Sequence, residues 1–340
     1  MILARAPLRM SFVGGGTDLA AFYTKHPGKV ISTAIDKFVY VVVNRTPLVP
    51  KVSARYSIAE TVEHPKDLKH TRIRELLLDL GIHKHIEIAS FAHLPAKTGL
   101  GSSSSFSVAL AKALYAFQGK KLSKQEVAEV ASRLEIDLVK EPIGKQDQYA
   151  AAFGGFNVIQ FNPDHTVDVT PLYLDFRKRL KLEDHLLLFY TGITRAASSV
   201  LTEQKANVDK KFEVLKKMAG SVDAFKDLLV AGDVEGMGKM LHESWLMKKS
   251  LASGVSSGLI DELYDAGIKQ GAFGGKVLGA GGGGCVMFLA PLDKKEAIRA
   301  EMKKTSEQNK LVEFREIPVQ FVQSGVEILY NADQQETIRI

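Results

Sequence analysis

The sequence contains a single cysteine, Cys285, among its 340 residues. One thiol excludes an internal disulfide and a cysteine-based metal cluster. No segment has 18 uninterrupted apolar residues, so we expect no membrane span. The first residues show no charged region followed by a long apolar core, so we expect no signal peptide, and the cytoplasm is the expected location.

Motifs that define several enzyme classes are also missing. The sequence has no metalloprotease or serine-hydrolase signature, and its nine histidines show no zinc-site spacing. Lys276 follows a glycine, but Val277 stands where a Walker A motif requires Ser or Thr. A formal G-x-G-x-x-G match over residues 279–284 precedes a strand pattern, where a dinucleotide-binding fold requires a helix.

The composition is that of a globular protein with a large core in one or two domains, with 45% hydrophobic and 25% charged residues. The formal net charge is +6, from 45 basic and 39 acidic residues. The basic residues are spread along helical stretches and mixed with acidic ones, which is typical of solvated helix faces. A mildly basic protein that handles phosphorylated small molecules fits this charge equally well, and we expect neither nucleic acid nor a membrane as partner.

The most informative segment is residues 95–105, with the sequence Pro-Ala-Lys-Thr-Gly-Leu-Gly-Ser-Ser-Ser-Ser. Gly99 and Gly101 allow a tight turn and a close approach to a ligand. Apolar residues at helical spacing follow from Phe106 to Phe117. The loop is therefore expected to lead into a helix whose free N–H groups and dipole attract an anion. The alternative, a flexible Ser/Gly linker, is disfavoured because apolar runs flank the segment.

Periodicity along the chain predicts an α+β protein with a domain boundary near residue 180, where a charged stretch interrupts the pattern. Ser123 and Glu126 form a capping box at the start of one predicted helix. The predicted strands cover residues 2–13, 30–44, 85–91, 156–161, 186–190, 276–279, 285–289, 312–319 and 325–330. The later helices are predicted over residues 197–219, 221–231, 233–250, 256–270 and 293–308.

Three other polar positions stand out. Asp18 follows three glycines at a strand end, where its carboxylate can bind sugar hydroxyls or cap a helix beginning at Leu19. Arg9 lies within an apolar strand, and such a charge is seldom buried without a partner. Asp147 lies in a segment that by itself indicates a polar turn. The glycines at 279–284 indicate a tight hairpin loop that packs against a ligand or another loop.

The three glycine-rich segments, in this order and with the serine loop in the middle, resemble the GHMP small-molecule kinases. The resemblance covers residues 6–289 and, within the superfamily, points to the heptose 7-phosphate kinases. It implies a GHMP kinase fold with an N-terminal domain like ribosomal protein S5 domain 2, over 1–180, and a C-terminal ferredoxin-like domain, over 181–340. It also implies ATP and Mg²⁺ in the cleft between the domains. The resemblance leaves open whether the protein is a monomer or a homodimer.

The resemblance assigns roles to particular positions. Asp147 matches the aspartate that faces the attacking hydroxyl, and Arg9 matches its arginine neighbour. Ser103 and Glu135 match the magnesium ligands, with Glu141 as the weaker alternative to Glu135. The implied phosphate loop contains Pro95, Gly99, Leu100, Gly101, Ser102, Ser103 and Ser104. The implied substrate-binding residues are Gly16, Thr17, Asp18, Lys145, Gln148, Arg195, Gly281 and Gly282.

One departure from the family pattern bears on the substrate. Galactokinase-like members carry Glu-His where this chain has Gly15 and Gly16. The smaller residues weaken galactose as substrate and leave room for a larger sugar. The resemblance implies that the reaction is phosphorylation of the anomeric hydroxyl of heptose 7-phosphate. The alternatives are a fucose-, galactose- or mevalonate-type kinase, a non-catalytic sugar or nucleotide sensor and, from another class, a nucleic-acid-binding protein.

Overall fold

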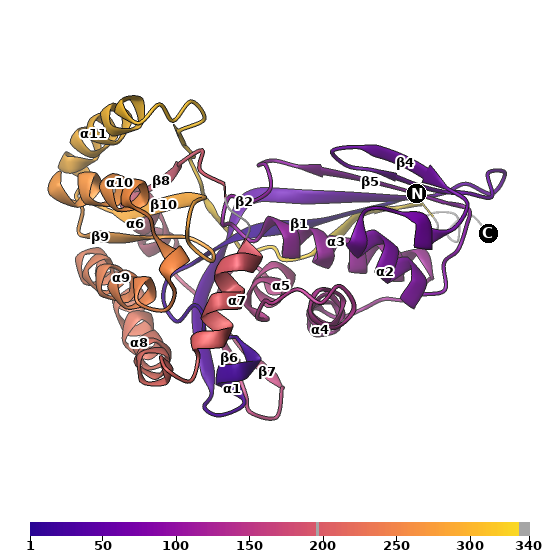
Figure 1. The fold of residues 1–340 in the computed structure, drawn as a ribbon, viewed down its shortest axis with the longest axis horizontal. Coiled ribbons are helices and arrows are strands. Elements are labelled where there is room, and N and C mark those ends of the chain that lie inside the picture. The colour runs from indigo at the N-terminus through magenta and orange to yellow at the C-terminus, as the bar shows by residue number, and fades with distance from the viewer. Residues whose placement is uncertain (195–196, 333–340) are drawn as a thin grey trace.

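The computed structural model describes residues 1–194 and 197–332. It has two parts, each built on its own sheet, joined along the middle of an elongated molecule (Figure 1). Both parts combine sheets with helices, as the predicted α+β class requires. Within the described residues, no helix is long and apolar enough to cross a membrane.

The first sheet is organised around β2 (Gly28–Arg45), a strand of 18 residues that pairs with β1 (Ile2–Ser11) along the whole of that strand. Val39, Val41 and Val43 of β2 are buried on one face, as their alternation predicts. Residues 39–45 of β2 pair with β5 (Ile86–Ala92), and residues 28–33 pair with β6 (Phe156–Phe161). The sheet is completed by β3 (Val52–Arg55), β4 (Ala59–Val62) and β7 (Val167–Leu172).

Helices cover one face of this sheet. α3 (Ser102–Phe117) packs on β1 and β2 through the apolar residues that the sequence predicted. α4 (Lys124–Arg133) begins with the predicted capping box, which is confirmed, and continues into a π-helix over Leu134–Leu138. The other helical segments of this part are α1 (Ala20–Tyr23), η1 (Pro65–Asp67), α2 (Thr71–Asp79) and α5 (Gln146–Phe153).

The second part has an antiparallel sheet in the order β11-β8-β10-β9 with helices packed around it. Its strands are β8 (Leu186–Tyr190), β9 (Gly274–Val277), β10 (Cys285–Leu289) and β11 (Arg315–Glu316). Its helices are α6 (Phe176–His185), α7 (Ala197–Asn207), α8 (Phe212–Ala231), α9 (Val234–Lys249), η3 (Ser253–Val255), α10 (Gly258–Lys269), η4 (Leu292–Lys294) and α11 (Lys295–Gln308).

Three sequence expectations differ from the structure. The helix break predicted at Gly220 occurs at residues 208–211, because Ala219 and Val222 pack into the core and outweigh the low helix propensity of glycine. The charged stretch near 180 is helix α6, capped by Asp175 and buried only at Leu182. The strand predicted over 312–319 shortens to β11.

The last two strands return to the first sheet. β12 (Phe321–Val322) pairs with β2, and β13 (Glu327–Asn331) pairs with β1. The expected division at 180 and 181 therefore does not describe this C-terminal segment, which belongs with the N-terminal part. The strand over 325–330 was predicted and corresponds to β13, but its sequence does not indicate which sheet it joins.

The returning segment also packs tightly against the end of α5. Val326 N donates to the carbonyl of Ala152 at 3.1 Å. A Cβ on Gly325 would lie 2.2 Å from the same carbonyl oxygen, which is closer than any real contact. The segment thus fixes one end of α5 through a contact that only glycine permits.

We expect Gly325→Ala to lower the free energy of unfolding by roughly 1–3 kcal/mol, the usual cost of overpacking. Gly220→Ala is the control, because its Cβ meets no atom within 4 Å and α8 gains helix propensity. Urea unfolding of both variants measures the difference. Equal midpoints for Gly325→Ala and the wild type would contradict the tight contact.

Candidate active site

A cavity of about 380 Å³ lies between the two parts and brings the three glycine-rich segments together. Its walls come from β1, α3, α5, α7, α9 and the π-helix. In Figure 1, α7 lies at the junction of the two parts, in front of β2. The polar and charged groups that line the cavity are Arg9, Ser11, Asp18, Arg72, Lys97, Ser102, Ser103, Ser104, Glu135, Glu141, Gln146, Asp147, Ser198, Gln204 and Lys248.

The serine loop forms the helix start that the sequence predicted. Gly101 has a left-handed φ of +75° and is the N-cap of α3, so Ser102 to Ser104 are the first helical residues. The first N–H groups of a helix have no partner within it. All three serines line the cavity. The predicted helix start is confirmed, and the anion that it would attract stays a prediction. Leu100 is fully buried under the loop and supports its shape.

The third glycine segment packs directly on the serine loop. A Cβ on Gly99 would lie 2.6 Å from the carbonyl oxygen of Leu278, and a Cβ on Gly279 would lie 2.8 Å from the Cα of Gly99. The prediction that this hairpin packs against another loop is confirmed. Gly279 lines the cavity, whereas Gly282 donates to the Val255 carbonyl at 2.8 Å.

Two glycines of this hairpin that were predicted to bind substrate lie away from the cavity. Gly281 and Gly282 face the backbone of Val255 and are outside the cavity lining, because the hairpin turns towards η3 after Ala280. Pro95 likewise lies outside the lining, while its neighbours Ala96 and Lys97 contribute to it.

Arg9 and Asp147 form a two-point ion pair inside the cavity. Arg9 Nε donates to Asp147 Oδ1 at 2.8 Å, and Nη2 donates to Oδ2 at 2.7 Å. A third donor, Nη1, binds the Gly99 carbonyl at 2.6 Å and so ties the pair to the serine loop. Asp147 lies in the first turn of α5, so the interpretation of its segment as a polar turn was wrong. The resemblance implied this pairing, and the structure brings the two side chains together.

Asp18 lies beside this pair and is buried. Its carboxylate accepts from the backbone N–H of Gly16 and of Gln146, both at 3.2 Å, and from Gln146 Nε2 at 3.1 Å. Burial, followed by the nearby charge of Asp147, raises the pKa of Asp18. Asp18 therefore does not cap α1, whose start has no side-chain cap. It instead binds the first N–H of α5.

Thr17 has a supporting position. Its buried Oγ1 lies 2.8 Å from the Gly14 carbonyl and 2.9 Å from the Lys29 carbonyl, which fixes the glycine turn before Asp18. Of the three neighbouring residues predicted to bind substrate, Gly16 and Asp18 line the cavity and Thr17 does not.

Glu135 connects the serine loop to α5. It is fully buried and stands on the π-helix, a form that often occurs at functional sites. Ser104 Oγ donates to its Oε2 at 2.7 Å and Gln148 Nε2 does so at 2.6 Å, while Arg72 Nε donates to Oε1 at 2.9 Å. Gln148, predicted to bind substrate, is completely buried and orients Glu135 because its helix position faces inward.

Two oxygen atoms meet where a magnesium ion is expected. Ser103 Oγ and Glu135 Oε1 are 3.5 Å apart, and both residues line the cavity. Mg²⁺ prefers oxygen ligands, keeps several waters and usually takes only one or two protein carboxylates. The described residues contain no group of three or more His, Cys, Asp or Glu that could hold a metal. This donor set fits Mg²⁺, while Glu141 lies farther out and binds Arg72 at 3.3 Å.

One predicted cation lies outside the cavity lining, and another cannot be placed. Lys145 points into a neighbouring pocket, where its Nζ donates to the His165 carbonyl at 3.2 Å and lies over the ring of Tyr23. Its position just before α5 turns it away from Asp147. Arg195 falls outside the residues that the structure describes.

Lys248 lines the cavity but was not among the predicted site residues. Lys248 lies on α9, is buried and lines the cavity. A signal was present, because Lys248 continues the apolar stripe of Leu241 and Trp245 at helical spacing. A lysine is seldom buried without a partner, but the apolar stripe does not indicate which group Lys248 would contact.

Comparisons with known proteins agree with this arrangement. Residues 68–155 match the family model of the GHMP kinase N-terminal domain, and residues 225–308 match that of the GHMP kinase C-terminal domain. The chain is 27% identical to D-glycero-alpha-D-manno-heptose 7-phosphate kinase of Campylobacter jejuni, over 89% of this chain and 93% of the relative. It is 31% identical to a galactokinase of Thermococcus kodakarensis, over 62% of this chain and 66% of the relative.

A solved structure supports the fold. The crystal structure of a D-glycero-D-manno-heptose 1-phosphate kinase from Bacteroides thetaiotaomicron superposes with a TM-score of 0.79. The alignment covers 97% of this chain and 99% of that one at 24% identity, a level that speaks for the fold alone. Because both family models match in order along the sequence, the chain belongs to the GHMP kinase superfamily and is an ATP-dependent phosphotransferase that acts on an alcohol group.

Proposed function

We propose that the protein is a sugar kinase that transfers the γ-phosphoryl group of ATP to the anomeric hydroxyl of a D-glycero-D-manno-heptose 7-phosphate. The carrying observation is that one cavity holds the helix N-terminus at Ser102, the Arg9–Asp147 pair and the open glycine turn at Gly15. The similarity to a heptose 7-phosphate kinase over nearly the full chain supports the choice of sugar.

The serine loop is the proposed binding site for the ATP phosphates. The free N–H groups at Ser102 to Ser104 and the dipole of α3 favour negative charge at this point. Ser103 and Glu135 would hold Mg²⁺, which supplies charge neutralisation to the phosphates when it is bound. The hydrogen bonds from Ser104, Gln148 and Arg72 keep the Glu135 carboxylate oriented towards Ser103.

Asp147 is the proposed proton acceptor. The sugar oxygen attacks the γ-phosphorus in line, the new O–P bond forms, and the bond between the γ-phosphorus and the β–γ bridging oxygen breaks. The hydroxyl proton passes to the Asp147 carboxylate, and ADP leaves. Arg9 holds both carboxylate oxygens at 2.7–2.8 Å, so it orients the base and offsets negative charge near the transferred group.

The acceptor would occupy the end of the cavity beside Asp18. A Cβ on Gly15 meets no atom within 4 Å, so this turn faces open space. The buried Asp18 carboxylate lies at the same end and can accept hydrogen bonds from sugar hydroxyls. This space suits a sugar longer than a hexose, and the 31% identity to a galactokinase makes galactose the alternative acceptor.

A panel of acceptors tests the assignment. We expect the highest kcat/KM with heptose 7-phosphate among heptose 7-phosphate, mannose, galactose and fucose, measured by coupled ADP release. Gly15→Glu should raise KM for heptose 7-phosphate at least about tenfold, since a carboxylate would repel the substrate phosphate. Gly15→Ala is the control and should stay within about twofold, because the space is open. A higher kcat/KM with galactose or fucose would replace the heptose assignment.

We expect Asp147→Asn to lower kcat by about 100- to 10,000-fold, the usual contribution of a general base. ATP binding should persist, because Ser102 to Ser104 are unchanged. Calorimetric titration with an ATP analogue and a kcat measurement separate the two effects. Asp227→Asn, on the exposed face of α8, is the matched control. A variant that keeps more than about a tenth of wild-type kcat would remove Asp147 from the role of base.

Glu135→Gln should raise the magnesium concentration needed for half-maximal activity by about 10- to 100-fold, because one charged ligand is lost. The measurement is a magnesium titration at saturating ATP. Glu141→Gln is the comparison, since Glu141 contacts Arg72 at the outer edge of the cluster and should change the titration little. If Glu141→Gln shifts the magnesium titration and Glu135→Gln does not, Glu141 replaces Glu135 as the proposed magnesium ligand.

A further inference from the structure

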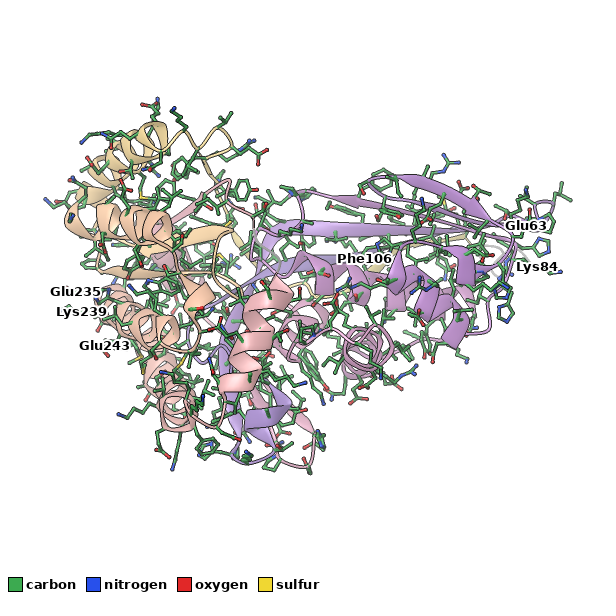
Figure 2. All side chains as sticks on the ribbon, in the orientation of Figure 1. Glu63, Lys84, Phe106, Glu235, Lys239 and Glu243 are labelled. Carbon is green, nitrogen blue, oxygen red and sulfur yellow. The ribbon has the colours of Figure 1, made fainter. Side chains whose placement is uncertain are left out.

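Lys248 is a buried ammonium group that the proposed mechanism does not use. It lies in the last turn of α9, is 5% exposed and forms part of the cavity wall. Glu235, Lys239 and Glu243 mark the outer edge of α9 in Figure 2. At 3.6 residues per turn, Lys248 is about half a turn around the helix from Lys239 and so faces inward. The C-terminal part thereby contributes a cation to the site.

The hydrogen bonding of Lys248 is incomplete. Within the part of the chain that the structure describes, its Nζ donates to one group, the carbonyl of Gly279. An ammonium group has three donors, and a buried charge with unused donors is costly. Lys276 differs, because it lies outside the cavity lining and its buried Nζ donates to the Phe12 carbonyl at 2.7 Å. Lys248 is the one of the two that faces ligand space.

The charges around Lys248 leave this region short of negative charge. The groups that act on it are Arg9 on β1, Lys276 on β9, Asp18 before α1 and Asp147 on α5. Asp147 is already committed to Arg9, and Asp18 uses its oxygens on the N–H of Gly16 and the backbone and side chain of Gln146. Among the residues that the structure describes, the two lysines therefore have no carboxylate of their own. A neutral sugar hydroxyl would not balance this charge, whereas an anion would.

We propose that Lys248 binds a phosphoryl oxyanion of the reacting substrates, through the two N–H donors that its bond to Gly279 leaves free. This inference rests on the proposed function. Gly279 packs on Gly99, which in turn accepts from Arg9, so Lys248 reaches the cavity near the ion pair and across from the start of α3. Two phosphoryl groups have this chemistry, namely the group in transfer and the phosphate already on the acceptor.

The environment gives Lys248 a distinct pH signature. Burial, followed by the charge of Arg9, lowers its pKa from 10.5 to about 8, while Asp18 and Asp147 act in the opposite direction. Its unfolded-state pKa is higher, so between pH 8 and 10.5 the unfolded chain binds more protons and Lys248 makes folding more favourable as pH rises. An anion-binding role predicts that activity falls over the same range.

The variants Lys248→Met and Lys248→Arg test the proposal. The control is Lys249→Met. In the wild type, Lys249 Nζ pairs with Asp261 at 3.1 Å, and both residues lie outside the cavity lining. We expect Lys248→Met to lower kcat/KM for heptose 7-phosphate by about 10- to 100-fold, the range for loss of a charged hydrogen bond. Lys248→Arg should keep most activity and shift the alkaline limb of the pH profile upward, which loss of packing alone would not do. Lys249→Met should match the wild type.

Two further measurements distinguish the sources of the phosphoryl group. Calorimetry compares the affinity of each variant for ADP and for the imido analogue of ATP, and kinetics compare heptose 7-phosphate with the unphosphorylated heptose. Weaker binding of the analogue with unchanged ADP binding, and loss of activity on both acceptors, supports contact with the transferred group. Loss confined to the phosphorylated acceptor supports contact with the acceptor phosphate.

Other outcomes would overturn the proposal. Wild-type affinities and a kcat/KM within about twofold in Lys248→Met would show that no phosphoryl group depends on this lysine. An unchanged alkaline limb in Lys248→Arg would do the same and remains measurable if Lys248→Met does not fold. The nucleotide titration needs no acceptor, so failure of the heptose assignment leaves the test of the transferred group intact.

Discussion

The ion pair between Arg9 and Asp147 is the interaction on which the site depends. It joins β1 to α5 through two hydrogen bonds, and a third from Arg9 to the Gly99 carbonyl fixes the serine loop relative to both. A largely buried ion pair is a poor source of stability, because desolvation offsets the attraction between the charges. Its presence makes sense as a positioning device, since it holds the Asp147 carboxylate and the start of α3 at one separation. Losing Arg9 would free the carboxylate and the loop together.

The N-terminal and C-terminal parts of the molecule contact each other through two glycines, Gly99 and Gly279. Gly99 and Gly279 approach so closely that a Cβ on either would collide with the other loop, and both have left-handed φ angles. This contact explains why a hairpin of the C-terminal part carries more glycines than a turn requires. It brings Lys248, which donates to the Gly279 carbonyl, to the same cavity as Arg9. The site is therefore completed only when both parts of the fold are in place.

Much of the fold was predictable because its signals are local. The helix start at Ser102, the capping box at Ser123 and the valine alternation in β2 each depend on neighbouring residues. The missed features depend on distant ones. The return of β12 and β13 to the first sheet, the inward turn of Gln148 towards Glu135 and the outward turn of Lys145 follow from packing between remote segments. The family resemblance supplied the roles of Asp147 and Arg9, which periodicity alone could not.

The start of α5 explains how two carboxylates, Asp18 and Asp147, can lie so close together. Asp147 stands in the first turn of this helix, and Asp18 accepts the N–H of Gln146 at the same end. The partial positive charge of a helix N-terminus favours both groups. Gly144 completes the arrangement, because a Cβ there would lie 2.0 Å from an oxygen of Asp18. Burial, followed by the nearby charge of Asp147, raises the pKa of Asp18. The two carboxylates thus share one helix start but have different partners, which are an arginine for Asp147 and N–H groups of Gly16 and Gln146 for Asp18.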